Sequence, residues 1–139
     1  MKTRTSLITS TFILAFLTLG AMQAQAIIIV NSRPVGITFG QTARVNLLNT
    51  SDSAIIIIGG KFFDSDGNIL AEFGRQVIEP GKIMSFDLNG DDIVRESNRI
   101  QIRGILEGPE PHLRGAIISL EVFNNADGKT TVFIVGPEY

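Results

Sequence analysis

Hydrophobic and polar residues alternate along much of the chain after residue 26. Because successive side chains of a β-strand point to opposite faces, this alternation predicts strands with one face on a core and the other in solvent. The residues expected to face the core are Ala43, Val45 and Leu47 in 43–47, Met84, Phe86 and Leu88 in 83–88, Ile100 and Ile102 in 99–103, and Ile118, Leu120 and Val122 in 117–122. Such a one-sided pattern is typical of an antiparallel sheet that covers a single core.

Two longer segments are expected to be strands although their pattern is less regular. Residues 54–63 are apolar on both faces, which predicts a central strand. The pair Gly59–Gly60 inside it marks either a bulge or a close backbone approach. Residues 69–78 form either one strand bent at Gly74 or two separate strands.

The two ends of this region also read as strands. Residues 27–30 and 35–39 predict a first strand that is broken near Pro34. Proline donates no ladder hydrogen bond, so this break suits an edge strand that crosses between sheets. Residues 130–135 predict the last strand.

Turn residues separate these strands at intervals of roughly 8 to 12 residues, which is the spacing of β-sandwiches and barrels. Pro80–Gly81 predicts a type II turn, Asn89–Gly90 another tight turn, and residues 107–115 a longer loop containing two prolines. No segment has helical periodicity. We therefore predict an all-β fold: a single immunoglobulin-like antiparallel β-sandwich of about seven or eight strands, spanning residues 27–139.

The first 26 residues have the composition of a secretory signal peptide. Lys2 and Arg4 precede an apolar stretch over residues 7–19, and Ala24 and Ala26 occupy the small-residue positions before a cleavage site. The apolar stretch is shorter than the roughly 18 residues of a membrane span. We expect a secreted or periplasmic protein without a membrane span after cleavage, the alternative being a retained N-terminal anchor.

The charge argues against nucleic-acid binding, and the cysteine content excludes disulfide bonds. Without Lys2 and Arg4, ten basic side chains stand against 14 acidic ones, a net charge near −4. Nucleic-acid binding, which requires clustered Lys and Arg, is therefore not expected. The chain contains no cysteine, so disulfides cannot stabilise the fold.

The stretch FFDSDGNIL (62–70) resembles a calcium loop, since Asp64 and Asp66 precede Gly67. An EF-hand with its invariant glycine at Gly67 would place phenylalanines at the first and twelfth ligand positions, which excludes it. A looser calcium site at Asp64 and Asp66 is one alternative. The other, which we favour, is a β-hairpin with Asp66–Gly67 at its tip.

A second segment supports the hairpin interpretation. FNNADGKTTVF (123–133) has the same order of aromatic strand, Asp127–Gly128 and apolar strand, but asparagines replace the early acids. A cation site would not be expected to tolerate that replacement, whereas a turn would. We expect no metal site and no cofactor.

The sequence offers little for catalysis. His112 is the only histidine, there is no cysteine, and no G-x-S-x-G stretch is present. We expect His112 to be a solvated loop residue and name no catalytic residue. The 14 acidic residues are enough to supply a pair of carboxylates for sugar hydrolysis, but most of them fall in turns or at outward strand positions.

Two further features concern the protein surface. The polar row Arg99, Gln101 and Arg103, extended by Arg44 if that residue lies beside it, could contact an acidic partner. The alternative is a solvated sheet face. Residues 49–51 match a glycosylation sequon.

Sugar binding by an aromatic platform is disfavoured because the chain has no Trp and its single Tyr is the last residue. The phenylalanines are expected mainly in the core: Phe39, Phe62, Phe63, Phe73, Phe86, Phe123 and Phe133.

The segments IEPGKIMSFDL, RIQIRGIL and ISLEVFNNADGKTTVFI resemble a group of small secreted bacterial proteins of uncharacterised function, and GQTARVNLLN and FFDSDGNIL fit the same pattern. The resemblance implies an immunoglobulin-like fold and supplies no activity or functional residues. Many members carry cysteines near the third and penultimate strands, which this chain lacks. A weaker likeness, at the level of the fold, is to the N-terminal domain of pilus-assembly chaperones.

We therefore predict an exported, non-catalytic module with an interaction or structural role in the periplasm or at the cell surface, whose partner is another protein or a surface component. One alternative is a fibre or adhesin-type subunit in which the IIIV segment (27–30) adds to a neighbour's sheet. A small secreted hydrolase and a calcium-binding module are less favoured alternatives.

Overall fold

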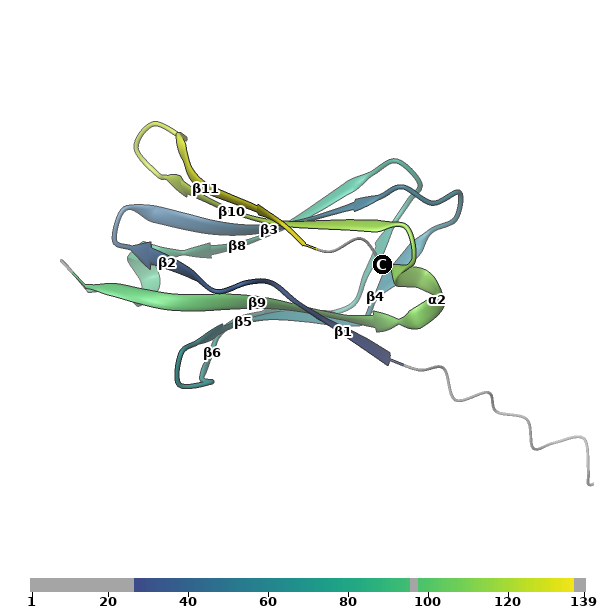
Figure 1. Ribbon diagram of the computed structural model, residues 1–139, viewed down its shortest axis with the longest axis horizontal. Coiled ribbons are helices and arrows are strands. Elements are labelled where there is room, and N and C mark those ends of the chain that lie inside the picture. The colour runs from purple at the N-terminus through teal and green to yellow at the C-terminus, as the bar shows by residue number, and fades with distance from the viewer. Residues whose placement is uncertain (1–26, 96–97, 137–139) are drawn as a thin grey trace, which may run out of the picture.

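The fold is an antiparallel β-sandwich of two main sheets (Figure 1). The structure is a computed structural model that describes residues 27–95 and 98–136, so the predicted signal peptide lies outside the described residues. In the described part of the chain, no helix is long and apolar enough to cross a membrane. The prediction of an all-β sandwich is confirmed.

The first sheet, called sheet A here, has the strand order β1 (Ile27–Asn31), β9 (Arg99–Pro109), β5 (Gly59–Asp64) and β6 (Ile69–Phe73). Strand β2 (Val35–Thr38) also pairs with β9, next to β1 along the same edge. The break near Pro34 is therefore as predicted, but both halves stay in one sheet and do not cross to the other.

The second sheet, sheet B, has the order β11 (Thr130–Val135), β10 (Ala116–Asn124), β3 (Gln41–Asn49) and β8 (Ile83–Asn89). A short ribbon of β4 (Ile55–Ile57) and β7 (Gln76–Ile78) lies beside these two sheets. When β1/β2, β4/β5 and β6/β7 are each taken as one interrupted strand, eight strands result, in agreement with the prediction.

The central pairings are those of immunoglobulin domains. The pairs β3–β8 and β5–β9 correspond to the B–E and C–F pairs of that fold. The outer strands differ, since the N-terminal β1 and β2 pair with β9 and the late strand β10 pairs with β3. Compared with the standard immunoglobulin order, β1 and β2 therefore lie in the other sheet, that of β9, and β10 lies in the sheet of β3.

Residues 54–63, expected to be one strand, form two. β4 pairs with β7, whereas β5 pairs with β9 and β6, so the segment changes partners at Ile58. At Gly59 a Cβ atom would lie 3.0 Å from the main-chain oxygen of Phe73, which is the close backbone approach predicted at the glycine pair, and at Gly60 it would overlap the Phe73 ring. Of the two alternatives for residues 69–78, the structure has two strands with Gly74 between them.

Two single helical turns were not predicted. Helix α1 (Gly90–Ile93) follows Asn89, whose side chain accepts a hydrogen bond from the Asp91 N–H at 3.1 Å, so the predicted Asn–Gly turn is instead a capped helical turn. Helix α2 (Glu110–Leu113) lies within the predicted loop 107–115, and β9 runs on to Pro109 before it. One turn is too short to show a helical period in the sequence.

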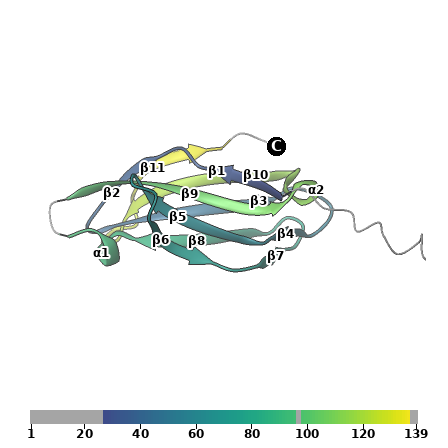
Figure 2. The same ribbon diagram turned by 90° about the horizontal axis from the view of Figure 1, so that it is seen from below.

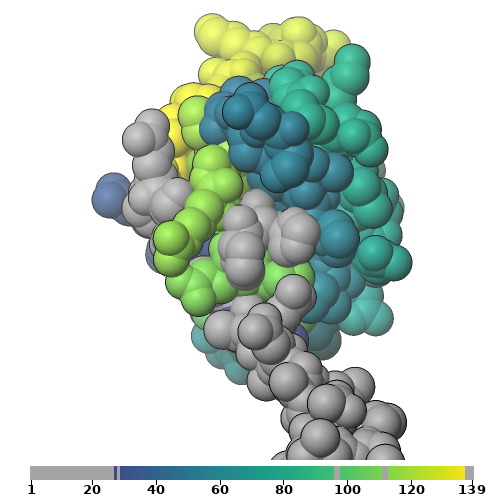
Figure 3. All heavy atoms as spheres, turned by 90° about the vertical axis from the view of Figure 1, so that its right-hand side faces the viewer, coloured from purple at the N-terminus to yellow at the C-terminus, as the bar shows by residue number. Residues whose placement is uncertain are grey.

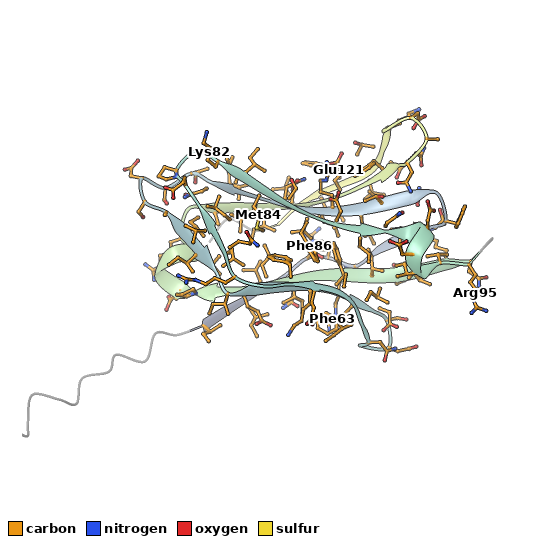
Figure 4. The ribbon with its side chains drawn as sticks, turned by 180° about the vertical axis from the view of Figure 1, so that it is seen from behind. Phe63, Lys82, Met84, Phe86, Arg95 and Glu121 are labelled. Carbon is orange, nitrogen blue, oxygen red and sulfur yellow. The ribbon has the colours of Figure 1, made fainter. Side chains whose placement is uncertain are left out.

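The core forms where the two sheets face each other. All eleven residues predicted to face inward in the four regular segments are buried or half-buried, and the polar residues between them face out. The rings of Phe62 and Phe86 stack across the sandwich at 5.1 Å, and Phe73 and Phe86 lie 4.2 Å apart. Figure 4 shows Met84 and Phe86 pointing between the layers.

Candidate binding face on sheet A

The predicted polar row lies on the outer face of sheet A, which is turned to the viewer in Figure 2. Arg99, Gln101 and Arg103 alternate along β9 with the inward-facing Ile100 and Ile102, and all three are exposed. Strand alternation therefore places them as the sequence predicts.

Arg103 is held by both neighbouring strands. Its guanidinium lies 5.2 Å from the centre of the Phe63 ring on β5, and it donates a hydrogen bond to Asn31 Oδ1 on β1 at 3.3 Å. Phe63 pairs with Arg103 across the β5–β9 ladder and points outward (Figure 4). The expectation that the phenylalanines belong to the core fails for Phe63, because its neighbour Phe62 takes the inward position.

Arg99 lies across the neighbouring strand β2. A Cβ atom at Gly36 would overlap the Arg99 guanidinium. The arginine can therefore lie against this strand because Gly36 has no side chain. The sequence gives no sign of this contact, because Gly36 and Arg99 are adjacent only through the β2–β9 pairing.

The FFDSDGNIL segment forms the β5–β6 hairpin, as predicted. Gly67 has a φ of 85°, which favours glycine, and the Asp64 and Asn68 main chains bond across the turn. The Asp64 carboxylate accepts hydrogen bonds from the N–H groups of Asp66 and Asn68, at 2.9 and 2.8 Å, and from the Asn68 side chain at 2.8 Å.

These hydrogen bonds, that from the Asn68 side chain first, lower the pKa of Asp64 below its usual range. Its carboxylate is therefore engaged as the cap of the turn. Within residues 27–95 and 98–136, no group of three or more His, Cys, Asp or Glu side chains is placed to hold a metal ion.

The hairpin and the polar row together border one groove. Its volume is about 530 Å³, and it is lined by Pro34, by residues 64–67 and by residues 101–103. Asp64 pairs with Ile102 across the β5–β9 ladder, which brings the turn beside the row. Two features that the sequence presents separately thus meet at one site.

Arg44 does not extend the polar row, so that part of the hypothesis is wrong. It lies on β3, and its guanidinium forms two hydrogen bonds with Asp87 of β8, at 2.6 and 2.7 Å, and lies 5.0 Å from the centre of the Phe123 ring. The bond to Asp87 raises the pKa of Arg44. Because β3 belongs to sheet B, Arg44 lies on the opposite side of the sandwich from the row.

The second Asp–Gly segment forms the β10–β11 hairpin, in which Gly128 has a φ of 67°. Its Asn125 takes a structural role. The amide oxygen accepts from the Thr42 hydroxyl at 2.6 Å, and the amide nitrogen donates to Asn89 and Asp91 at 3.0 and 3.1 Å. The asparagines that replace the early acids therefore tie this hairpin to the neighbouring loops.

The predicted sequon begins at a buried residue. The Asn49 side chain is 0% exposed and donates to the carbonyls of Ser53 and Ile78, both at 2.8 Å, while accepting from the Ser51 N–H at 2.9 Å and the Ser51 hydroxyl at 2.7 Å. The segments around residues 50, 80 and 115 meet at this end of the molecule (Figure 3). A glycan on the Asn49 nitrogen has no room in the folded chain.

Within the described residues, the remaining predicted positions show no second site. His112 belongs to α2 and not to a loop, and its side chain lies outside the part of the molecule that the structure describes. Phe39 and Phe133, expected in the core, are both exposed.

Comparisons with protein-family models, with curated proteins and with solved structures find no match for this chain. The resemblance to small secreted bacterial proteins therefore stays a prediction.

Proposed function

We propose that this protein is an exported, non-catalytic interaction module of the periplasm or cell surface that binds a polypeptide segment on the outer face of sheet A. The observation that carries the proposal is the groove between the Asp64–Gly67 turn and the Gln101–Arg103 stretch of β9. The signal-peptide pattern of residues 1–26 supports export.

The chemistry of the groove fits a peptide. Arg103 provides a positive charge and flat surface, Gln101 both a donor and an acceptor, and Pro34 an apolar edge. In the described structure the Asp66 carboxylate makes no hydrogen bond or ion pair, so it can receive a basic group or an N–H. Arginine and aromatic side chains such as Arg103 and Phe63 are enriched in protein interfaces.

The same groove gives little support to catalysis. A general acid requires a carboxyl group whose pKa is raised towards neutrality. The pKa of Asp64 is instead lowered, because its oxygens accept N–H groups of its own turn. This favours binding over hydrolysis as the role of the face.

The proposal can be tested by selecting a random-peptide display library on the purified protein and measuring the affinity of the enriched peptides. We expect micromolar dissociation constants and a loss of affinity of at least about tenfold in Arg103→Ala, equivalent to about 1.4 kcal/mol. Arg44→Ala, on the opposite face, is the matched control and should bind normally. Failure to enrich any peptide, or equal binding by both variants, would contradict the proposal.

The fibre alternative has one observation in its favour. Strand β1 is at the edge of sheet A, and its Ile27 and Ile29 are exposed. However, all five of its residues pair with β9 of the same chain, and Val30 is buried in the core. We therefore rank a donated N-terminal strand below the binding module.

A further inference from the structure

The four edge strands of the sandwich differ in how they are protected from pairing with another chain. Edge strands of natural proteins usually carry charged residues, proline or bulges that discourage such pairing. β6 carries Glu72, and β8 carries Asp87. These two lie on one side of the sandwich, whereas β1 and β11 lie on the other (Figure 2).

Neither β1 nor β11 carries a charged residue, and β11 is the longer of these two edge strands. Its six residues, Thr130–Val135, include no charge, glycine or proline, and most of them favour strands strongly. Phe133 is 59% and Val135 52% exposed on the outer side of sheet B. One protective device is present, a bulge near Thr131 where the register of β11 against β10 shifts. β1 is shorter and ends before the break at Pro34.

The main-chain hydrogen bonds of β11 leave a defined set of groups at the open edge. The N–H of Gly136 donates to the Ile118 carbonyl of β10 at 2.7 Å. In an antiparallel ladder every second residue bonds to the same neighbour, so Ile134 and Val132 also face β10. The N–H and C=O groups of Phe133 and Val135 therefore face outward.

We infer that a second copy of this chain occupies this edge, with the two β11 strands pairing antiparallel around a two-fold axis at Ile134. In this register Phe133 of each chain exchanges both main-chain hydrogen bonds with Val135 of the other, for about four bonds in all. Each exposed phenylalanine ring then contacts a β-branched side chain, which is a favourable cross-strand pair.

The choice of a second copy as the occupant rests on the strand's neutrality and on this register. In a two-fold arrangement any charge on the strand would lie close to its own copy, and β11 has none. This register involves only residues that follow the bulge. The main-chain N–H and C=O groups that it pairs point away from β10. The interface lies on sheet B, so the inference does not rest on the proposed function of sheet A.

The experiment is sedimentation velocity of the purified protein over a range of concentrations, for the wild type and for two edge variants. Phe133→Lys and Val135→Glu should each weaken the dimer at least about tenfold, because an unpaired charge is introduced at the pairing edge. Mixing the two variants should restore a heterodimer, since the lysine introduced in one chain would face the glutamate introduced in the other. Ile83→Lys is the control, because Ile83 is 64% exposed on the opposite edge strand of the same sheet.

A disulfide provides a second readout that does not depend on affinity. Because the chain contains no cysteine, an Ile134→Cys variant carries a single thiol. Opposed residues at this position would lie within the range of a disulfide and should form a covalent dimer on oxidation, whereas Val132→Cys should not. A strictly monomeric wild type, or a dimer that the edge variants leave unchanged, would overturn the inference.

Discussion

Asn49 connects several segments at one end of the molecule. Its side chain is fully buried, and all its hydrogen-bonding groups have partners: two carbonyls for the amide nitrogen, and the Ser51 N–H and hydroxyl for the oxygen. Its main chain also pairs with Gly81 and Lys82. A single residue thereby ties the end of β3 to the turn before β8 and to the end of β7.

Replacing Asn49 with alanine should therefore destabilise the fold. Asn49→Ala removes the side-chain donor of the Ile78 carbonyl and leaves the Ser53 carbonyl with the Ser51 hydroxyl alone, and we expect the free energy of unfolding to fall by about 2–4 kcal/mol. Chemical denaturation measures this change. The matched control is Asn46→Ala, which removes one hydrogen bond at the surface, to Ser85, and should cost about 0.5 kcal/mol or less. Equal effects of the two substitutions would contradict the role assigned to Asn49.

Contacts between individual residues that are far apart in the chain are the features that the sequence predicts least well. The NTS pattern at Asn49 is that of a glycosylation site on the surface, whereas the residue is buried. The sequence does not reveal this burial, because one of the carbonyls that surround the Asn49 side chain lies 29 positions away in the chain. The contact of Gly36 with Arg99 escapes prediction for the same reason. Alternation along a strand gives the direction of a side chain but not its cross-strand neighbour.

At the scale of elements, the sequence predicts strands well where one face is buried. The four alternating segments and the two Asp–Gly hairpins are found where expected, since both depend on local rules of pleat and turn. The division of residues 54–63 into β4 and β5 was not predicted, because an apolar run is equally compatible with one strand or two. What divides it is a change of pairing partner, which is not a local property.

The position of β5 against β6 depends on Gly60. Gly60→Ala would push a methyl group into the ring of Phe73, and we expect a loss of about 1–3 kcal/mol in the free energy of unfolding. Gly74→Ala is the control at the break between β6 and β7, where no atom lies within 4 Å of a Cβ and φ is not positive, so it should be neutral or slightly stabilising. Thermal melting of both variants distinguishes them. A neutral Gly60→Ala would mean that Phe73 can move aside without cost.

At the scale of the whole molecule, the pairing of the chain ends is what the sequence does not reveal. The sandwich class follows from strand spacing, but the exchange of β1 and β10 between sheets depends on competition among distant strands. The candidate binding face has the same origin: β9 and the β5–β6 turn are both recognisable in the sequence, and only the fold brings them together at Asp64 and Ile102.

Removing residues 27–30 tests the role of β1. We expect the shortened chain to have a lower melting temperature and to lose roughly 1.5–3 kcal/mol from Val30 alone, since this side chain is buried in the core. Its oligomeric state, measured by size-exclusion chromatography, should match that of the intact chain. If the deletion instead dissociated an assembly and left the domain's stability unchanged, the fibre alternative would be favoured.

The pairing of β1 with β9 also determines the order in which the protein can fold. Ile27 pairs with Pro109 and Asn31 with Ile105, so the first described strand to be synthesised waits for more than 70 further residues before its ladder can close. Long-range pairing of this kind slows folding, because loop closure precedes any gain from the contacts. During that interval the apolar IIIV segment has no partner, and an unpaired apolar strand is prone to aggregation. A factor that holds the nascent N-terminus until β9 emerges should therefore raise the yield of folded protein.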